Sequence, residues 1–314
     1  MSGRKFGLFK NDLIILNNAI IDAVENKSFL VVGGAGSIGH STIQEIIKRK
    51  PKKVHVVDIN ENGLAEVVRN CRSSFELTDT ELKVFCFSAL SKNFSSMVQN
   101  QDGYDYILNL AAIKHVRSEE DPFTLLNMIY TNIILNRQCA ELALKMSGCK
   151  YFCVSTDKAA NPHNAMGATK KLMEMAVSEF CSKLRISSAR FANVLFSNGS
   201  LTASFKKRIE LAQPLAIPCN IERYFITLEE AGQLCLISCI FGDSSDIFFP
   251  KTDRHFKLIT FEEIVKRFLK FKGLNPVYFE RETDARKACK ELNLNIEYPV
   301  LITNPDTTGE KPSK

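Results

Sequence analysis

The chain has 314 residues, of which 45% are hydrophobic and 24% charged, and its formal net charge is +6. This is ordinary globular composition, with enough length for one large domain or two modest ones. Because lysines and acidic residues alternate along the chain and form no basic tract, the charge gives no indication of nucleic acid binding.

The spacing of the ten cysteines indicates a reducing compartment and gives no indication of a metal site or of disulfides. None are spaced as a CxxC pair, and Cys149/Cys153 and Cys235/Cys239 fall inside apolar segments. We therefore expect buried thiols in a reducing cytosol, without disulfides or metal ligands. No signal peptide opens the chain and no apolar run is long enough to span a bilayer, so we expect a cytoplasmic protein.

The first predicted element is a helix over residues 8–25. Its apolar side chains recur at helical spacing, at Leu13, Leu16, Ile20 and Val24. We assign residues 1–27 to an N-terminal helix that packs on the body of the protein or on a partner subunit.

A glycine-rich turn follows an apolar strand at 29–32 and opens a helix that runs to about residue 49. Its glycines fit GxGxxG from Gly34 and GxxGxxG from Gly33, sharing Gly36 and Gly39. Such a turn between a strand and a helix lets the backbone approach a pyrophosphate. We expect the dinucleotide to be bound here by Gly33, Gly36, Ser37, Ile38 and Gly39.

A second strand at 54–57 ends in Asp58, which lies 19 residues beyond Gly39. An acid at this distance from the turn binds the adenine ribose hydroxyls. A carboxylate repels a 2′-phosphate, so Asp58 favours NAD over NADP. Arg69 and Arg72 on the following helix offset this argument and leave NADP open.

The third and fourth strands, at 82–87 and 104–110, end in small residues against which a cofactor can lie. We expect cofactor contacts from Ser88, Ala89, Leu90, Ala111 and Ala112. Lys114 and His115 come next and would face cofactor or substrate phosphates. A purely structural hydrogen-bonding role for His115 is equally compatible with its position.

A long helix is predicted from Asp121–Pro122, since proline suits the first turn, to about Met146. Asn132 falls inside it. Its amide is placed to hydrogen-bond the backbone or a water of the site, and we count it among the cofactor-binding residues.

The fifth strand, at 151–154, ends in a polar tip, Ser155 to Lys158, followed by a loop and a helix over about 163–184. Open α/β sheets present catalytic groups at the carboxyl ends of their strands. The tip and helix bring two lysines and one carboxylate together, which favours a catalytic site over a solvated loop with an incidental ion pair. The candidate catalytic residues are Thr156, Asp157, Lys158, Met166 and Lys170.

A sixth strand at 186–190 ends the alternation of strands and helices. Six such strands with intervening helices predict a doubly wound parallel sheet, a Rossmann domain over residues 28–190. Residues 191–314 predict a smaller α+β lobe, partly interleaved with the sheet domain, that closes a cleft over the cofactor. The last dozen residues are expected to form a loop or tail.

The glycine turn, the Lys114–His115 segment and the stretch STDKAANPHNAMGATK at 155–170 together resemble the extended short-chain dehydrogenase/reductases. Within that superfamily the chain is similar, over roughly residues 28–310, to the UDP-N-acetylglucosamine 4,6-dehydratase group of polysaccharide biosynthesis proteins. The resemblance implies a Rossmann fold, NAD or NADP, a UDP-linked sugar substrate, and a homodimer or higher homo-oligomer.

Three positions depart from the pattern of these relatives. Met166 stands where the superfamily has a tyrosine four residues before Lys170, although a subgroup of the dehydratases also has methionine there. A thioether cannot transfer a proton as a phenol does. Asn198 stands where related chains commonly have arginine, and Ala192 where they usually have glycine.

Dehydration removes hydride from C4, a proton from C5 and the hydroxyl from C6 of the hexose. We assign Lys158 as the C5 base, Asp157 as the acid that expels the C6 hydroxyl, and Thr156 as the partner of the C4 oxygen. Lys170 would hold the nicotinamide ribose, and Met166 would form an apolar wall.

The resemblance further implies substrate contacts from Asn193 and Arg223, and we also expect Lys114, His115 and Ser200 to contact the substrate. Two other functions remain open at this stage. One is an NAD-dependent nucleotide-sugar 4-epimerase, which needs no C5 base. The other is a catalytically silent NAD-binding regulatory protein, which the loss of the tyrosine favours and the retained lysines disfavour.

Overall fold

The computed structural model describes residues 3–115, 119–252 and 256–304, so the tail expected at the end of the chain lies outside the described residues from residue 305 onward. The chain divides into two compact units. The sheet unit comprises Phe9–Phe191 and Glu229–Pro250. The C-terminal unit comprises the described parts of Met1–Leu8, Ala192–Leu228 and Lys251–Lys314.

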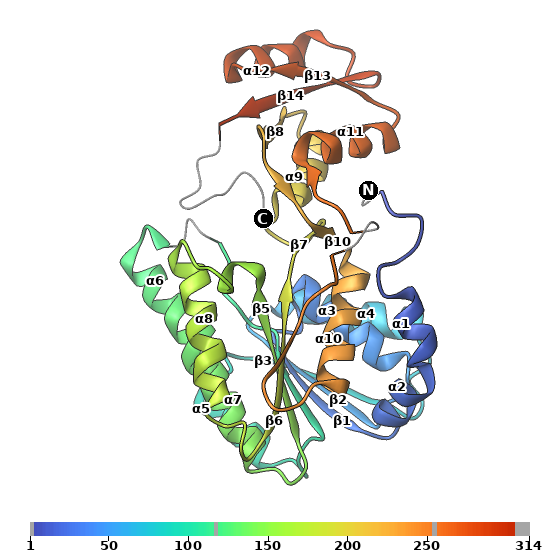
Figure 1. Ribbon diagram of the computed structural model, residues 1–314. Coiled ribbons are helices and arrows are strands. Elements are labelled where there is room, and N and C mark those ends of the chain that lie inside the picture. The colour runs from blue at the N-terminus through green and yellow to red at the C-terminus, as the bar shows by residue number, and fades with distance from the viewer. Residues whose placement is uncertain (1–2, 116–118, 253–255, 305–314) are drawn as a thin grey trace. The chain divides into compact units, whose positions relative to one another are not determined.

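A seven-stranded parallel sheet forms the centre of the sheet unit (Figure 1). The strand order is β11-β6-β5-β4-β1-β2-β3, with every neighbouring pair parallel. The inner strands are buried because helices cover both faces, which explains their continuous apolar runs. The strands are β1 Ser28–Val32, β2 Lys53–Asp58, β3 Glu81–Cys86, β4 Tyr106–Asn109, β5 Lys150–Thr156, β6 Arg185–Phe191 and β11 Asp246–Phe248.

Helices cover the two faces of this sheet, as in a doubly wound α/β fold, and the predicted fold class is confirmed (Figure 1). One core cluster joins α5, α7 and α8 to the strands through side chains such as Phe94, Leu135 and Met173. The helices after each strand are α3 Ser37–Ile47, α4 Glu61–Ser74, α5 Lys92–Gln99, α6 Pro122–Ile129, α7 Leu135–Leu144, α8 Ala165–Ser178 and α10 Leu228–Phe241.

The prediction that the alternation ends after the sixth strand was wrong, because α10 and β11 return to the sheet unit. β11 pairs with β6 in parallel, with Ile247 opposite Ser188. The side chains of α10 from Glu230 to Ile240 are all buried, so the helix shows no polar stripe in its sequence. The Ser187 hydroxyl donates to the Ser238 carbonyl at 2.7 Å and fixes α10 against β6.

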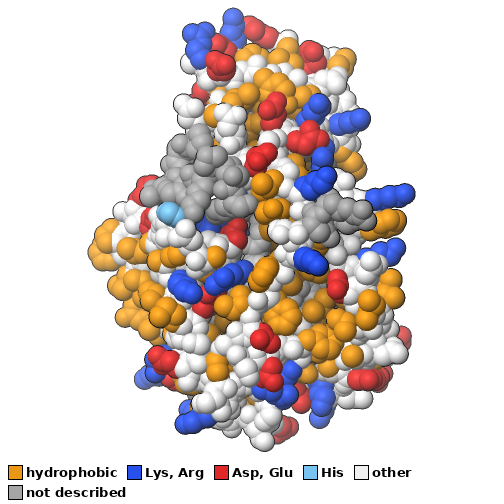
Figure 2. All heavy atoms as spheres, viewed as in Figure 1, with side chains coloured by type: hydrophobic (Ala, Val, Ile, Leu, Met, Phe, Trp, Pro, Cys, Tyr) orange, Lys and Arg blue, Asp and Glu red, His pale blue; other side chains and the backbone are white. Residues whose placement is uncertain are grey.

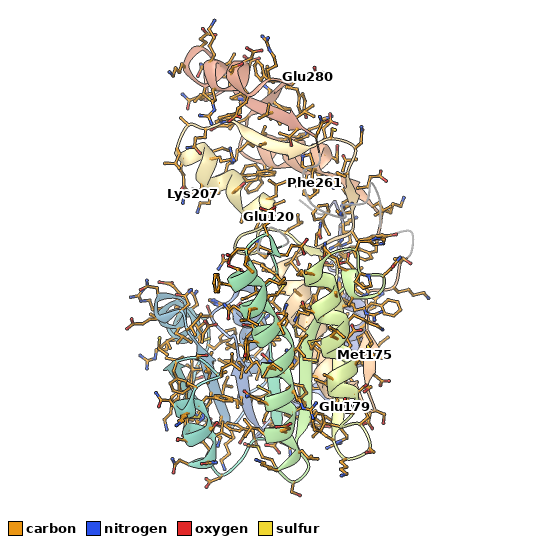
Figure 3. All side chains as sticks on the ribbon, turned by 90° about the vertical axis from the view of Figure 1, so that its left-hand side faces the viewer. Glu120, Met175, Glu179, Lys207, Phe261 and Glu280 are labelled. Carbon is orange, nitrogen blue, oxygen red and sulfur yellow. The ribbon has the colours of Figure 1, made fainter. Side chains whose placement is uncertain are left out.

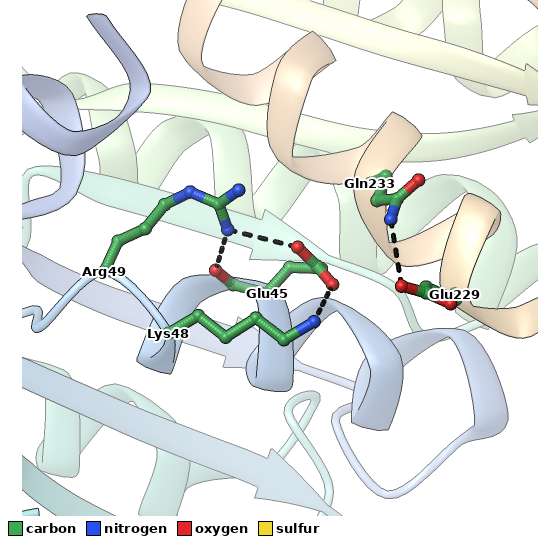
Figure 4. A network of polar contacts seen from close by, with 5 residues as sticks. All are labelled: Glu45, Lys48, Arg49, Glu229 and Gln233. Carbon is green, nitrogen blue, oxygen red and sulfur yellow. Dashed lines mark hydrogen bonds and ion pairs between the residues drawn. The ribbon is translucent and has the colours of Figure 1, made fainter. Parts of the chain in front are cut away.

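Two cations that follow the last residue of α3 form ion pairs with a buried acid of that helix. Glu45 is 3% exposed, and its carboxylate is bound by Lys48 and by Arg49, the latter at 3.1 Å (Figure 4). On α10 the Gln233 amide donates to Glu229 at 3.3 Å. Removal of one partner of a buried ion pair is strongly destabilising, so this cluster is structural.

Two predicted helices are interrupted. The N-terminal helix is divided at Leu16 into α1, Lys10–Ile15, and α2, Asn17–Val24. The helix predicted over 121–146 contains a π-helical turn, η2, Tyr130–Ile134, between α6 and α7. Single π-helical turns are frequent at functional sites.

The C-terminal unit is a mixed α and β structure with its own apolar core, which includes Phe205, Phe225, Phe268 and Val300. A parallel three-stranded sheet, in the order β13-β14-β8, contains β13 Asn275–Phe279, β14 Glu297–Thr303 and β8 Leu215–Pro218. Its helices are α9 Leu201–Glu210, α11 Phe261–Phe271 and α12 Glu282–Glu291.

Two small sheets lie beside this core in the C-terminal unit. β7, Asn193–Val194, pairs in parallel with β10, Phe225–Ile226. β9, Glu222–Arg223, pairs antiparallel with β12, Ile259–Thr260. Residues 222–226 therefore contribute to both small sheets.

Candidate active site

The glycine turn between β1 and α3 is shaped by close backbone packing. Gly33 has φ +78°, and a Cβ there would lie 2.4 Å from the backbone nitrogen of Ala111. Only glycine fits this conformation and this approach. The N-cap of α3 is Gly36, which has no side chain of its own to cap the first turn of the helix. A phosphate can approach backbone N–H groups at such a helix start.

Asp58 lies at the end of β2 and holds this turn in place. One carboxylate oxygen accepts the Ala35 N–H at 2.9 Å and the other accepts the Asn60 N–H at 3.0 Å. The spacing of Asp58 from the glycine turn does not indicate this structural role. Each carboxylate oxygen has a second acceptor site, so binding of ribose hydroxyls remains compatible with the observed contacts.

The other predicted cofactor residues lie at the same edge of the sheet. Val32 is opposite both Val57 and Asn109, so β1, β2 and β4 end together. The Asn109 side chain accepts the Ala111 N–H at 3.1 Å and shapes the loop of small residues. After β3, the Ser88 hydroxyl accepts the N–H of Leu90 at 3.2 Å, and the intervening Ala89 is 8% exposed.

Asn132 lies in the π-helical turn η2 and is fully buried. Its side chain accepts the N–H of Ile113 at 3.1 Å and donates to the Ile113 carbonyl at 3.0 Å. The same amide also donates to the Thr169 hydroxyl of α8 at 3.1 Å. Asn132 thus fixes the loop that leads to Lys114 and His115, both of which are exposed, relative to the helix that carries Lys170.

The polar tip forms a compact turn after β5. The strand extends to Thr156, two residues further than predicted, and η3, Asp157–Ala159, follows directly. The Thr156 hydroxyl donates to Asp157 Oδ1 at 3.0 Å, and Lys158 Nζ lies 3.7 Å from the same oxygen. The Asp157 and Lys158 side chains are 33% and 27% exposed, so both are accessible for proton transfer.

The first turn of α8 packs directly on this tip. A Cβ on Gly167 would lie 2.9 Å from the Lys158 carbonyl oxygen, so glycine is needed for the approach. The Asn164 side chain caps the helix by accepting the Gly167 N–H at 2.9 Å. Glu119, which no sequence motif marks, accepts the Ala165 N–H at 2.7 Å. Met166 is 4% exposed.

Lys170 is buried beneath the tip, with only 4% of its surface exposed. Its Nζ donates to the Val154 carbonyl of β5 at 2.8 Å. Burial lowers the pKa of Lys170 from its ordinary value of 10.5 to about 8, although Cys153 and Glu174 act in the opposite direction. Lys170 therefore places an ammonium group at the end of β5, and this group loses its proton more readily than an exposed lysine does.

A buried ion pair, which the sequence analysis missed, lies one helical turn beyond Lys170. Arg190 donates to both oxygens of Glu174, at 2.9 and 2.7 Å, and the Ser155 hydroxyl donates to Glu174 at 2.6 Å. The hydrogen bond to Glu174 raises the pKa of Arg190. Met175 and Glu179, in contrast, lie on the outer side of α8 (Figure 3). An acid four residues after Lys170 was the available signal, since such residues share a helix face.

Three predicted substrate residues lie in the C-terminal unit. The Asn193 N–H donates to the Tyr224 carbonyl at 3.0 Å, which places it beside the segment that carries Arg223. Arg223 is 4% exposed, and one of its nitrogens donates to the Glu222 carbonyl at 2.7 Å. Ser200 caps α9 by accepting the Ala203 N–H at 3.2 Å. The structure therefore brings Asn193 and Arg223 together within the C-terminal unit, whereas Lys114 and His115 belong to the sheet unit.

Among the described residues, no group of three or more histidine, cysteine or acidic side chains is arranged to hold a metal ion. Within the same residues, no helix has the length and apolar character needed to cross a membrane. The predicted core cysteines Cys149, Cys153, Cys235 and Cys239 are buried free thiols.

Comparison with known protein families shows to which family the chain belongs. Residues 29–287 match the family described as polysaccharide biosynthesis protein. The chain belongs to this family. It is a group of extended short-chain dehydrogenase/reductases, as the motifs predicted.

The chain is similar in sequence to three known proteins with different descriptions. An uncharacterized membrane protein of Methanocaldococcus jannaschii, MJ1061, is 32% identical over 234 residues, covering 72% of this chain and 67% of that protein. The capsular polysaccharide biosynthesis protein CapD of Staphylococcus aureus is 29% identical over 85% of this chain, which spans only 44% of CapD. The UDP-glucose 4-epimerase of Rickettsia massiliae is 27% identical over 72% of this chain and 67% of its own length.

Solved structures share the fold. Pen from Bacillus thuringiensis has a TM-score of 0.72 at 21% identity, covering 92% of this chain and 80% of Pen. The enzyme WbmF of Bordetella bronchiseptica, solved with NAD+ and UDP, has a TM-score of 0.63 at 17% identity, covering 79% of this chain and 77% of WbmF. At these identities the likeness supports the Rossmann architecture of this polysaccharide biosynthesis protein and no finer assignment.

Proposed function

We propose that this protein is an NAD-dependent nucleotide-sugar 4,6-dehydratase that converts UDP-N-acetylglucosamine to a UDP-4-keto-6-deoxy-hexosamine for glycan biosynthesis. The observation that carries the proposal is the tip of β5, where an amine and a carboxylate lie 3.7 Å apart beside a buried methionine. A site that only oxidises and reduces C4 needs one acid–base group, which exchanges the proton of the C4 hydroxyl. A site that must also remove a C5 proton and expel a C6 hydroxyl needs both groups.

The residues at the glycine turn fit NAD. A Cβ added at Gly36 would meet, among the described atoms, only the Gly33 carbonyl oxygen, at 3.4 Å, so the cradle above the turn is open. Asp58 offers acceptors for the ribose hydroxyls and disfavours a 2′-phosphate, while Arg69 is paired with Glu66. When bound, NAD would take hydride from C4 and return it to C6. Lys170 and the loop after β4 would hold the nicotinamide half.

Lys158 and Asp157 would act as a coupled pair. The neutral Lys158 amine takes the C5 proton, the electron pair of that bond forms the C5–C6 double bond, and the C6 hydroxyl leaves as water with the proton of Asp157. Asp157 would receive its proton from the C4 hydroxyl through Thr156, as hydride leaves C4. After the elimination the pair is ammonium and carboxylate, and their 3.7 Å separation stabilises these charges. As hydride reaches C6, Lys158 would return its proton to C5, so both groups regain their starting states.

Three neighbours would support these steps. Thr156 shares a hydrogen bond with Asp157 and reaches the C4 oxygen from the end of the strand. Lys170 adds a positive field at that oxygen from beneath. Met166 would exclude water from the ring, because its thioether forms an apolar wall and takes no part in proton transfer.

The test is product analysis after incubation with UDP-N-acetylglucosamine and NAD. A dehydratase gives a product that has lost one water and absorbs in base as a 4-keto-6-deoxy sugar. Recovery of unchanged substrate, with NAD bound, would refute the proposal and favour a regulatory NAD-binding protein.

The alternative function is a nucleotide-sugar 4-epimerase, and the similarity to the Rickettsia massiliae enzyme favours it. An epimerase retains the C6 hydroxyl, so its product has the mass of the substrate and differs only at C4. The same incubation separates the two reactions by mass and by proton NMR of C4.

The proposed oligomeric state is a homodimer or a higher homo-oligomer. Figure 2 shows hydrophobic side chains gathered over the region of α6 and α8. Phe123 of α6 is 81% exposed, and Leu172 and Met175 of α8 are 50% and 56% exposed. An apolar face of this kind supports association of copies, and sedimentation at several concentrations tests it.

A further inference from the structure

The first residues of the chain form an arm on the C-terminal unit, although the next residues belong to the sheet unit. The arm comprises residues 3–8, and the chain enters the sheet unit at Phe9. The Arg4 guanidinium donates to the Phe225 carbonyl at 2.9 Å. It also lies over the Phe256 ring, 5.6 Å from the ring centre. A hydrogen bond and a cation–π contact therefore fix one arginine of the arm on this unit.

These contacts surround the segment that carries the proposed substrate residues. The ring of Phe256 packs on that of Tyr224, with centroids 4.8 Å apart. Tyr224 lies between Arg223 and Phe225, and its carbonyl accepts the N–H of Asn193. Arg4 thus holds residues 224 and 225 from one side, while Asn193 pairs with them from another.

This segment has little regular structure of its own to fix it. β9 and β10 have two residues each, and Tyr224 between them belongs to neither strand. Short strands share few ladder hydrogen bonds, so side-chain contacts make a larger contribution to their position. Arg4 supplies two such contacts from a part of the chain more than two hundred residues away.

We propose that Arg4 is a positioning residue for nucleotide-sugar binding, which sets the segment of Arg223 so that its guanidinium and the Asn193 side chain meet the ligand diphosphate. The inference rests on the proposed function for the identity of the ligand. Arg4 itself touches neither the substrate nor the reacting atoms. Its loss weakens nucleotide-sugar binding and leaves NAD binding and the chemical step unchanged.

The test compares Arg4→Ala, Arg4→Lys and Lys5→Ala in the full-length protein. Lys5 is the matched control, because it is the neighbouring cation, is exposed, and lies near the Phe6 ring instead of Phe256. Calorimetry measures the Kd for UDP, for UDP-N-acetylglucosamine and for NAD, and steady-state assays separate KM from kcat.

Arg4→Ala is expected to raise the Kd and KM for the nucleotide sugar roughly fivefold to tenfold, with kcat within about twofold. Arg4→Lys should recover part of the affinity, because an ammonium group can still donate to the Phe225 carbonyl. Lys5→Ala should match the wild type. An Arg4→Ala protein whose nucleotide-sugar affinity equals that of Lys5→Ala, or whose NAD affinity falls equally, would overturn the inference.

The same measurements separate this inference from the proposed function. Wild-type protein that binds the nucleotide sugar but forms no dehydrated product refutes the reaction, and the Kd comparison for Arg4 still decides the inference. Product formation with unchanged binding by Arg4→Ala refutes only the inference. Wild-type protein that binds no uridine nucleotide would overturn both.

Discussion

Two lysines stand at the carboxyl end of β5 in opposite environments. Lys170 is buried, donates to a strand carbonyl and has a pKa lowered to about 8 by burial. Lys158 is partly exposed and faces a carboxylate across 3.7 Å. The first is held by a hydrogen bond to the strand, whereas the second has only an ion pair within the tip. Under the proposed function, the buried amine would supply position and field, and the partly exposed amine would transfer the proton.

The largest expected effect comes from removing the partly exposed amine of Lys158. Lys158→Met should lower kcat about 10³-fold, because general base catalysis contributes 10²–10⁴. The measurement is the rate of 4-keto-6-deoxy product formation, together with solvent deuterium at C5. Lys183→Met, at an exposed lysine, is the control and should leave the rate unchanged. Deuterium appearing at C5 with Lys158→Met would count against the assignment of the base.

The second prediction concerns the ion pair of Glu174 with Arg190, which lies one helical turn beyond the buried Lys170. Glu174→Ala should lower the free energy of unfolding by about 3 kcal/mol, because it leaves Arg190 and Ser155 without their buried partner. Glu179→Ala on the same helix removes an exposed pair with Arg137, 3.3 Å apart, and should change the free energy by less than about 0.5 kcal/mol. Urea denaturation of both variants tests the difference. Equal midpoints would mean that these contacts of Glu174 do not stabilise the packing of α8 on β5 and β6.

The burial of Lys170 has a stability cost that depends on pH. Its pKa is about 8 in the folded protein and 10.5 ordinarily, so the unfolded chain binds more protons between these values. The free energy of unfolding contributed by this group therefore rises as the pH increases from 8 to 10.5. Below pH 8 both states are protonated, and the full cost of the buried charge remains.

Lys170→Met should consequently raise the free energy of unfolding by about 2 kcal/mol at pH 7, after the lost hydrogen bond to Val154 is taken into account. The gain should shrink as the pH approaches 10, while activity is lost at every pH. Thermal denaturation between pH 7 and 10 measures it. A variant less stable than the wild type at pH 7 would show that the Val154 contact outweighs the desolvation of the charge.

The sequence was sufficient for six of the seven strands of the parallel sheet and for the glycine turn. Apolar runs such as 29–32 and the glycine turn have local signals, because strand burial and turn geometry depend on neighbouring residues. β11 has three residues and follows an irregular loop, so no periodicity marks it. The π-helical turn at Asn132 and the contact of Glu174 with Arg190 arise from packing between elements, and residue spacing alone does not specify that packing.

The smallest effect on kcat is expected at Thr156, which lies between the buried strand β5 and the partly exposed tip. Thr156 is the last residue of β5, and its hydroxyl donates to Asp157 Oδ1 at 3.0 Å. Thr156→Val keeps the shape but loses this hydrogen bond, which is worth about 1 kcal/mol, so kcat should fall roughly fivefold. Thr156→Ser retains the hydroxyl and should remain within about twofold of the wild type. A fall of Thr156→Val as large as that of Lys158→Met would mean that Thr156 itself transfers the C4 proton, and an unchanged rate would exclude it from the site.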